Sequence, residues 1–445
     1  MNSPPISRRN LLRTTGLAAL GGLGLSACGS PFASGVAGTG PSANTLAYWN
    51  LLGGGDGVRM VAMQDQYRKQ HPEVNLEAVT LAWGNPYYTK VTLSTLGDQP
   101  PDVAIAHLTR ATILADAGLL EPLEGDLLTK YGLTADNFTS TQWDKAHTNG
   151  TLYAIPLDTH PFVMFYNTDI CQKAGLLDSS GNLKSLDGPT ALVDALRAAK
   201  QVTKAYGGVF SINNDTATPW RLFSSLYYQL GGGSVLGDEG RQIVMKDDLA
   251  EQALDYIAGL TVREKLMPSS VDYGGATTMF ASQQAGFYFE GDWEVSTFIT
   301  AKTPFSMTQL PNVFGGQYYV QADSHSFVLP RDAKRDDKRR EVIFGFIRSM
   351  LDQSKTWAEG GHIPAWKPFV DGSEYDTIKP QSNYKGVADA ARYDDPGWYS
   401  GSGSDFEYIV GSAIAAVAAG QSSPKQAVAE MRTRLTKYAN TAAPV

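Results

Sequence analysis

The chain has 445 residues, of which 42% are hydrophobic and 18% are charged, and its formal net charge is −8. This length is too great for one ordinary core and predicts two domains. The acidic balance lacks the basic footprint of nucleic-acid-binding domains, so we expect a soluble globular protein with no nucleic acid as partner.

The first 28 residues have the features of an export signal rather than of a folded element. Ser7–Leu12 carries twin arginines, as in a Tat-type signal, and Leu17–Leu25 is a short apolar stretch. Leu25–Cys28 reads LSAC and resembles a lipobox, in which cleavage leaves Cys28 as the lipid-modified first residue. Residues 29–44 are rich in Gly, Ser, Ala and Pro and predict a flexible tether. We expect an extracytoplasmic protein that is held at the membrane only by this lipid.

The next part of the chain alternates strands with helices. The predicted order is strand 45–51, helix 58–70, strand 74–81, helix 87–96 and strand 103–106. This is a doubly wound α/β pattern, in which ligands bind beyond the carboxyl ends of strands. The segments at those ends are Trp49-Asn50, Trp83-Gly84-Asn85 and His107-Leu108-Thr109. The glycine-rich loop at 53–57 has no following Gly-Lys-Ser/Thr, so a phosphate loop is not supported.

The segment Gly150–Asp169 predicts a crossing between two sheets. Leu152–Ile155 and Phe162–Tyr166 have the composition of strands. Between them lies Leu157–Pro161, a polar stretch with a proline at each side, which cannot donate a ladder hydrogen bond. We expect its polar side chains to face a cleft.

The remainder of the chain is predicted to be mainly helical, with a few strands. Further helices are expected at 190–206, 220–230, 247–265, 334–350, 405–419 and 424–438, and further strands at 284–289, 305–310 and 326–329. Cys171 is the only cysteine outside the leader, and we expect it to be a buried apolar residue without a disulfide.

Several short motifs, in this order, resemble the extracellular solute-binding proteins of sugar-importing ABC transporters, the maltodextrin-binding-like class. They are the lipobox and tether, Tyr48-Trp49, Pro101-Asp102-Val103, Ala117–Leu123, Gly150–Pro156, Phe165–Asp169, Lys173–Leu176, Phe280–Trp293 and Gly360–Ala365. The resemblance covers nearly all of the chain after the leader.

The resemblance implies a two-lobed periplasmic-binding-protein fold of type II, an α/β fold with a ligand cleft between discontinuous lobes. Lobe 1 is then expected at 45–156 plus 302–360, and lobe 2 at 157–301 plus 361–445. It also implies a monomer without a cofactor that captures a sugar or sugar derivative and delivers it to ABC permease subunits in the membrane.

Positions that match the family's motifs imply a set of ligand-binding residues in the cleft. They are Trp49, Asn50, Asn85, Tyr87, His107, Asp158, His160, Glu290, Asp292, Trp293, Asp323, Ser324 and His325. Trp220, Trp366 and Trp398 are further candidates for stacking on a sugar ring.

The histidines and carboxylates in this set suggest a ligand with a cationic or donor-rich group, such as an amino sugar or a glycerophosphodiester. Apart from Arg110, beside His107, no arginine is expected in the pocket loops, which disfavours an anionic sugar phosphate.

Two other classes of function remain open. The first is a lipid-anchored glycoside hydrolase that uses the paired carboxylates Glu290 and Asp292, and the second is an adhesion lipoprotein with a degenerate cleft. We expect no enzyme activity. No metal site is expected either, because the six histidines are scattered and no His-Glu-x-x-His motif is present.

Overall fold

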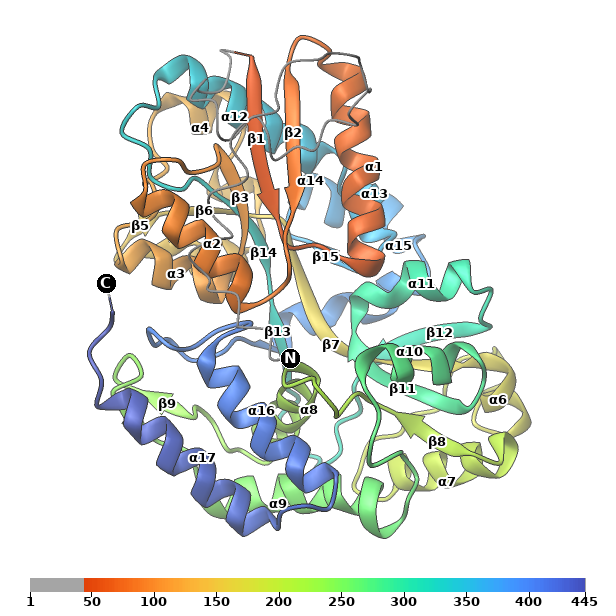
Figure 1. The fold of residues 1–445 in the computed structure, drawn as a ribbon. Coiled ribbons are helices and arrows are strands. Elements are labelled where there is room, and N and C mark those ends of the chain that lie inside the picture. The colour runs from red at the N-terminus through yellow and green to blue at the C-terminus, as the bar shows by residue number, and fades with distance from the viewer. Residues whose placement is uncertain (1–43, 445) are drawn as a thin grey trace, which may run out of the picture. The chain divides into compact units, whose positions relative to one another are not determined.

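The computed structural model of the protein describes residues 44–444. The expected signal, Cys28 and nearly all of the expected tether lie outside the described residues. Within the described part, two large sheets are each covered by helices (Figure 1). No helix between residues 44 and 444 combines the length and apolar character needed to cross a membrane.

The first sheet has five strands in the order β2-β1-β3-β14-β6. Their bounds are β1 Thr45–Asn50, β2 Asn75–Thr80, β3 Val103–His107, β14 His325–Val328 and β6 Ala154–Pro156. β1 pairs in parallel with β2 and β3, while β14 runs antiparallel to β3 and β6. The expected alternation of strand and helix is therefore confirmed in this part of the chain.

The second sheet has seven strands, of which five follow the order β16-β13-β7-β11-β8, while β12 and β15 also pair with β7. Their bounds are β7 Asp158–Asn167, β8 Tyr206–Val209, β11 Ala285–Gly291, β12 Phe305–Gln309, β13 Val320–Asp323, β15 Ile363–Pro364 and β16 Ala391–Arg392. Every residue of β7 is buried, because this strand carries partners along its whole length.

Each sheet has its own hydrophobic core. The first core lies under helices α1 Gly54–Gln70, α2 Asn85–Leu96, α3 Leu108–Asp116, α12 Asp337–Asp352 and α13 Ser354–Ala358. The second core lies under α6 Thr168–Lys173, α7 Ala191–Thr203, α8 Ala217–Gln229, α9 Asp247–Ala258, α10 Tyr273–Ala281, α11 Val295–Thr300, α16 Asp405–Ala418 and α17 Pro424–Ala439. Cys171 is buried in the second core, as expected.

Shorter elements complete the connections. They are α4 Asp126–Lys130, α5 Ser140–Lys145, α14 Lys367–Val370, α15 Ser373–Asp376, β4 His147–Thr148, β5 Thr151–Leu152, β9 Leu236–Gly237 and β10 Gln242–Ile243. The irregular helical turns are η2 Ala135–Asn137, η3 Gly259–Arg263, η4 Asp292–Glu294 and η5 Gln381–Ala390.

Helix α1 begins at Gly54, four residues before the predicted start. Its first turn packs closely against the second sheet's side of the molecule, since a Cβ atom on Gly55 would lie 2.3 Å from the carbonyl oxygen of Trp293. Most of the glycine run that we expected to be a loop is thus the first turn of a helix, and only glycine at position 55 allows this approach.

Three crossings connect the two sheets. The first passes from β6 to β7 at Leu157, the second from β13 to β14 at Ser324, and the third from α13 to β15 through residues 359–362. The expected polar loop at 157–161 is largely strand, since Asp158–Pro161 form the start of β7 and pair with β13 and β15.

The second crossing comes later in the chain than the expected lobe boundary at residue 302. β12 and β13 still belong to the second sheet, because β12 pairs with β7 from Val163 to Asn167 and β13 pairs at Pro161 and His160. The chain changes sheet only at Ser324, between Asp323 and His325.

Candidate ligand-binding cleft

A cavity of about 380 Å³ lies between the two sheets. Its first wall comes from the loops at the carboxyl ends of β1 and β2, namely Leu51–Gly54 and Leu81–Trp83, together with Asp56 in the first turn of α1. These are the strand ends at which an α/β sheet binds ligands.

The second wall belongs to the other sheet. Asp215, Thr218 and Arg221 lie at the start of α8, and Tyr273 lies at the start of α10. Asp215 lies just before the N-cap of α8, and its Oδ1 accepts hydrogen bonds from the first backbone N–H groups of the helix, those of Ala217 (2.9 Å) and Thr218 (3.2 Å). The helix N-terminus is therefore already occupied by a carboxylate of the chain itself.

Two tryptophans from opposite walls flank one arginine. The guanidinium of Arg221 lies 4.8 Å from the ring centre of Trp293 and 6.0 Å from that of Trp83. Burial opposes the charge on Arg221, but Glu407 and Glu290 raise its pKa. Trp293 Nε1 donates to the hydroxyl of Tyr273 (2.8 Å), which in turn donates to Glu294. Trp83 is 43% exposed, so its ring is available to a ligand.

Three histidines, His107, His160 and His325, form the histidine floor of the cavity. Their ring centres are 4.2 Å apart for His160 and His325, 5.0 Å for His107 and His325, and 5.4 Å for His107 and His160. His160 and His325 come from the first two crossings, and His107 ends β3. The floor therefore lies at the hinge between the sheets.

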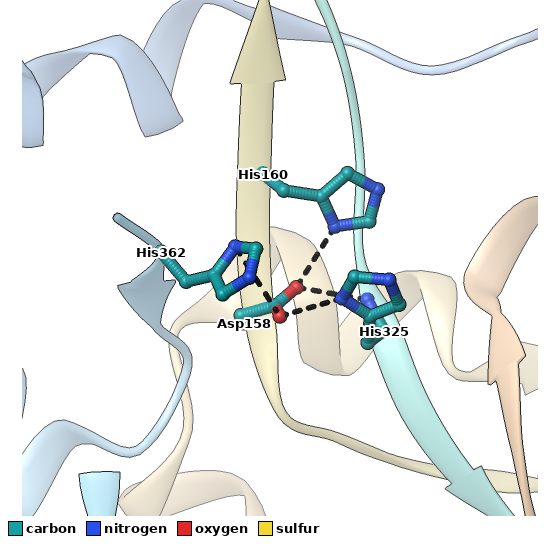
Figure 2. A group of neighbouring side chains, drawn as sticks. All are labelled: Asp158, His160, His325 and His362. Atoms are coloured by element: carbon teal, nitrogen blue, oxygen red, sulfur yellow. Dashed lines mark hydrogen bonds and ion pairs between the residues drawn. The ribbon is translucent and has the colours of Figure 1, made fainter. Parts of the chain in front are cut away.

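Asp158 lies beneath the histidine floor and is fully buried (Figure 2). Its Oδ1 accepts from His160 Nδ1 (3.1 Å) and from the backbone N–H of His325 (2.8 Å), and its Oδ2 accepts from His325 Nδ1 (2.8 Å) and Trp357 Nε1 (2.7 Å). Burial alone would raise the pKa of Asp158, but the imidazoles of His325 and His362 and the hydrogen-bond donors hold it well below its usual range.

The third crossing contributes His362, which lies among three buried carboxylates. Its Nε2 is 2.8 Å from Asp56 Oδ1, and its Nδ1 is 3.3 Å from Asp292 Oδ1 and 3.8 Å from Asp158 Oδ2. Burial opposes the charge, but Asp56, Asp292 and Asp158 raise the pKa of His362 well above its ordinary value. Burial also raises the pKa of Asp292 to about 6.

The ligand atoms of Asp158, His160, His325 and His362 lie within 4.8 Å of one another, and three imidazoles with one carboxylate are a donor set that suits zinc. Both oxygens of Asp158, however, already accept two hydrogen bonds each from within the chain. Two of the four donors are the imidazoles of His160 and His325 themselves. The sequence analysis expected no metal site because the histidines are scattered along the chain. The fold brings three of them together here, and the expectation of no metal site stays a prediction.

Four of the residues expected from the sequence line the cavity: His107, His160, Trp293 and His325. Asp158 lies directly below it. Asp323 and Ser324 are on the second crossing but are bonded to Thr109 and Tyr393, respectively, away from the cavity lining.

The other expected residues hold the walls together. Asn50 accepts from the backbone N–H of Leu52 (3.1 Å), and Tyr87 donates to the carbonyl of Ile105 (2.6 Å). The remaining residues of this group are likewise off the cavity lining: Trp49 under Lys90, Asn85 bonded to Asp405, Glu290 bonded to Thr218, and Asp292 beside His362. Trp220, Trp366 and Trp398 do not line the cavity.

The sequence reasoning missed several lining residues, above all Arg221, Tyr273, Asp215 and Glu294. It placed Trp83 at a ligand-facing strand end but left it out of the expected ligand-binding set. The expectation of no pocket arginine besides Arg110 is corrected: Arg221 reaches the cavity from α8, whereas Arg110 stacks on Tyr88. A single charge inside an apolar helical segment was the signal that could have identified Arg221.

Both rims of the cleft are in contact, so the sheets are closed on the cavity. At one rim, Arg59 on α1 donates to Ser296 on α11 (3.2 Å). At the other, Asn85 donates to Asp405 (3.1 Å), and a Cβ atom on Gly403 would lie 2.5 Å from the Cα of Gly84.

Comparisons with known proteins agree with this architecture. The Arabinooligosaccharide-binding protein of Bacillus subtilis (strain 168) is 24% identical over 359 residues, or 76% of each chain. Among solved structures, the GacH receptor of Streptomyces glaucescens has a TM-score of 0.72 at 18% identity, covering 88% of this chain and 98% of its own. The maltose-bound MalE3 of T. maritima has a TM-score of 0.74 at 16% identity, covering 88% and 99%. These likenesses confirm the expected two-lobed α/β fold. The sequence model of the bacterial extracellular solute-binding proteins matches residues 52–353, and the chain belongs to this family.

Proposed function

We propose that the chain captures a sugar or sugar derivative in the cavity and delivers it to the permease of an ABC importer. The observation that carries this proposal is the pairing of two tryptophans from opposite walls, Trp83 and Trp293, above a polar floor. Tryptophan faces cover the apolar side of a sugar ring, while imidazoles and carboxylates bind its hydroxyls.

The cavity volume of about 380 Å³ suits a small ligand, at the lower end of the range of about 300–1,000 Å³ that is typical of small-molecule sites. The relatives named above bind oligosaccharides or maltose by their names, which supports a carbohydrate. An amino sugar remains part of the proposal because three carboxylates, Asp56, Asp215 and Glu294, line the cavity, and a glycerophosphodiester remains because Arg221 does.

Closure of the two sheets over the ligand supplies the signal for delivery. The rims carry polar contacts and glycines rather than a large apolar seal, so they can part by a hinge motion at the three crossings. The closed, loaded protein is then the form that the permease recognises.

The location of the protein follows its family, which is extracellular. We propose that the chain is exported by the Tat route, lipidated at Cys28 and held at the membrane as a monomer. A Cys28→Ser variant should lose the incorporation of a labelled fatty acid that the original chain shows.

A glycoside hydrolase is not favoured by the geometry. The carboxyl groups of Glu290 and Asp292 are fully buried and do not line the cavity. Glu290 is held by Thr218 and lies 3.8 Å from Arg221, and Asp292 faces His362. We therefore propose a binding protein without catalytic activity.

The test is a thermal-shift screen of the full chain, followed by calorimetry of any hit. The panel contains maltose, an arabino-oligosaccharide, a galacto-oligosaccharide, mannitol, glucosamine and glycerophosphocholine. A ligand at 100 times its Kd should stabilise the protein by about 2.7 kcal/mol. Saturable binding without product supports the proposal, while turnover of an oligosaccharide, or no stabilisation by any of these solutes, contradicts it.

A further inference from the structure

We propose that the histidine floor is a subsite that binds hydrogen-bond donors of the ligand. Asp158 is the positioning residue of this subsite, because it determines which ring nitrogens carry hydrogens and which can accept them. The inference rests on the proposed function in one respect only, which is that the ligand occupies the cavity between the two sheets.

The first step concerns the tautomers of His160 and His325. An ionised carboxylate only accepts hydrogen bonds, so the Nδ1 atoms that lie 3.1 and 2.8 Å from Asp158 must carry the hydrogens. In a neutral imidazole this leaves a bare lone pair on Nε2. Burial lowers the pKa of His160 to about 3, which keeps that ring neutral at physiological pH.

The direction of these lone pairs follows from the geometry. Figure 2 shows that Nδ1 of His160 and of His325 faces Asp158, while the second ring nitrogen of each is turned away from it. Both rings line the cavity, and no residue between 44 and 444 forms a hydrogen bond with either Nε2. With both rings neutral, two adjacent acceptors are thus offered to a ligand.

His107 has the opposite hydrogen-bonding role, because its Nε2 donates instead of accepting. The hydroxyl oxygen of Tyr88 accepts from the backbone N–H of His107 (3.0 Å) and lies 2.7 Å from its Nδ1. Among residues 44–444 this hydroxyl has no other acceptor, so its hydrogen goes to Nδ1, and His107 carries its own hydrogen on Nε2. The floor therefore combines two acceptors with one donor.

This pattern selects a chemical class of ligand. Two neighbouring hydroxyls, or a hydroxyl beside an amine, can donate to His160 and His325 while one of them accepts from His107. A phosphate or carboxylate at the same place would face two lone pairs and a buried anion beneath them, which is unfavourable. We therefore infer a neutral or cationic polyol whose donor pair contacts the floor.

The direct test is ¹⁵N NMR of the full chain labelled at histidine, because long-range ¹H–¹⁵N correlations distinguish the two tautomers. His160 and His325 should show the hydrogen on Nδ1, and His107 should show it on Nε2, with signals assigned through single His→Gln variants. This measurement needs no ligand, so it stands even if the sugar screen fails. Nε2–H tautomers at both His160 and His325 would overturn the inference.

The second test uses Asp158→Asn. The new amide has one accepting oxygen and one NH₂ group, so at least one ring must reverse its tautomer and turn an N–H into the cavity. We expect about tenfold or greater loss of affinity for the sugar found in the screen, together with the changed NMR signature. The matched control is Asp394→Asn, a buried carboxylate away from the cavity that also accepts an indole N–H, from Trp220 at 2.9 Å.

Ligand analogues and zinc complete the design. The phosphorylated form of the same sugar, and its O-methyl ethers, should bind at least about tenfold more weakly than the parent sugar, since they lose the donors. Equal binding of the phosphorylated form contradicts the inference. Saturable binding of Zn²⁺ that displaces the hydrogens from Nδ1 of His160 and His325 also overturns it, because those atoms would then be metal ligands.

Discussion

Asp56 and His362 join the wall of the cavity to the hinge. Asp56 lies in the first turn of α1 and lines the cavity, and its Oδ1 is 2.8 Å from Nε2 of His362 on the third crossing. A ligand that contacts Asp56 in this wall is therefore linked, through the ion pair of Asp56 with His362, to a segment that connects the two sheets.

Removal of this ion pair should weaken the fold and the closed state together. Asp56→Asn leaves the imidazolium of His362 with only Asp292 and Asp158, and breaking a buried pair costs about 3–5 kcal/mol. We expect the low end of that range in urea unfolding, with weaker ligand binding. Asp65→Asn on the same helix is the control, because that pair with Arg68 is exposed and should cost less than about 1 kcal/mol. Equal effects of the two variants would show that Asp56 has no special role.

Trp83 and Trp293 should both be needed for ligand binding. Truncation of either ring to alanine removes one stacking face of the cavity, and we expect a rise in Kd of roughly tenfold for each, from aromatic contact energies of about 0.5–1.5 kcal/mol beyond area burial. Calorimetry with the identified sugar measures this. Trp398→Ala is the control, since that ring packs against Tyr399 and Tyr438 away from the cavity. Unchanged affinity in both cleft variants would place the ligand elsewhere.

Gly403 should control closure of one rim. A methyl group there would collide with Gly84, and the positive φ of 65° adds backbone strain. Gly403→Ala is expected to open the rim and lower ligand affinity, with an increased radius of gyration in small-angle X-ray scattering. Gly181→Ala separates the two effects, because it has a φ of 82° but open space around the new methyl. If both variants bind ligand alike, the close contact does not limit closure.

Glu407 should make stability depend on pH. Burial, reinforced by Asp394, raises its pKa to about 8, although Arg221 opposes this. The unfolded chain loses this proton near pH 4.5, the ordinary pKa of a glutamate, while the folded chain keeps it up to about pH 8. The unfolded state therefore binds fewer protons in this window, and stability falls as the pH rises.

Glu407→Gln removes this titration. The free energy of unfolding of the variant, relative to the original chain, should increase between about pH 5 and about pH 8. Urea unfolding at both pH values measures the difference. Glu430→Gln, an exposed site on α17, should show no such change. A difference between Glu407→Gln and the original chain that stays constant with pH would contradict the assigned cause.

The sequence predicted the framework of the first sheet closely. β1, β2, β3 and α2 occur where alternation and helical spacing placed them, and α16 and α17 match the two predicted closing helices to within one residue. These segments have strong local periodicity, so local pattern and tertiary packing agree. Prediction was weaker at the first crossing, where Asp158–Pro161 are polar and proline-bounded in the sequence but are strand in the structure because β13 and β15 supply partners from far along the chain.

The residues of the candidate site likewise fall into two groups, those that the sequence predicted and those that depend on packing. Strand ends and crossings are visible in sequence, and these gave His107, His160 and His325. The lone charge in an apolar helical segment marks Arg221 in the sequence, but its contact with Trp293 depends on how α8 packs, and that of Tyr273 depends on how α10 packs.

By itself, the sequence determined the α/β class, the family and the segments that border the cleft, because hydrophobic periodicity and short motifs are local properties of the chain. Only the tertiary structure decided which side chains meet in the cavity and which ring nitrogens face it. The hydrogen on Nδ1 of His160 and of His325 is fixed by Asp158, and helix α13, more than 190 residues later and just before the third crossing, supplies Trp357 to the same carboxylate. These hydrogen bonds to Asp158 form only when the three crossings pack together in the folded chain.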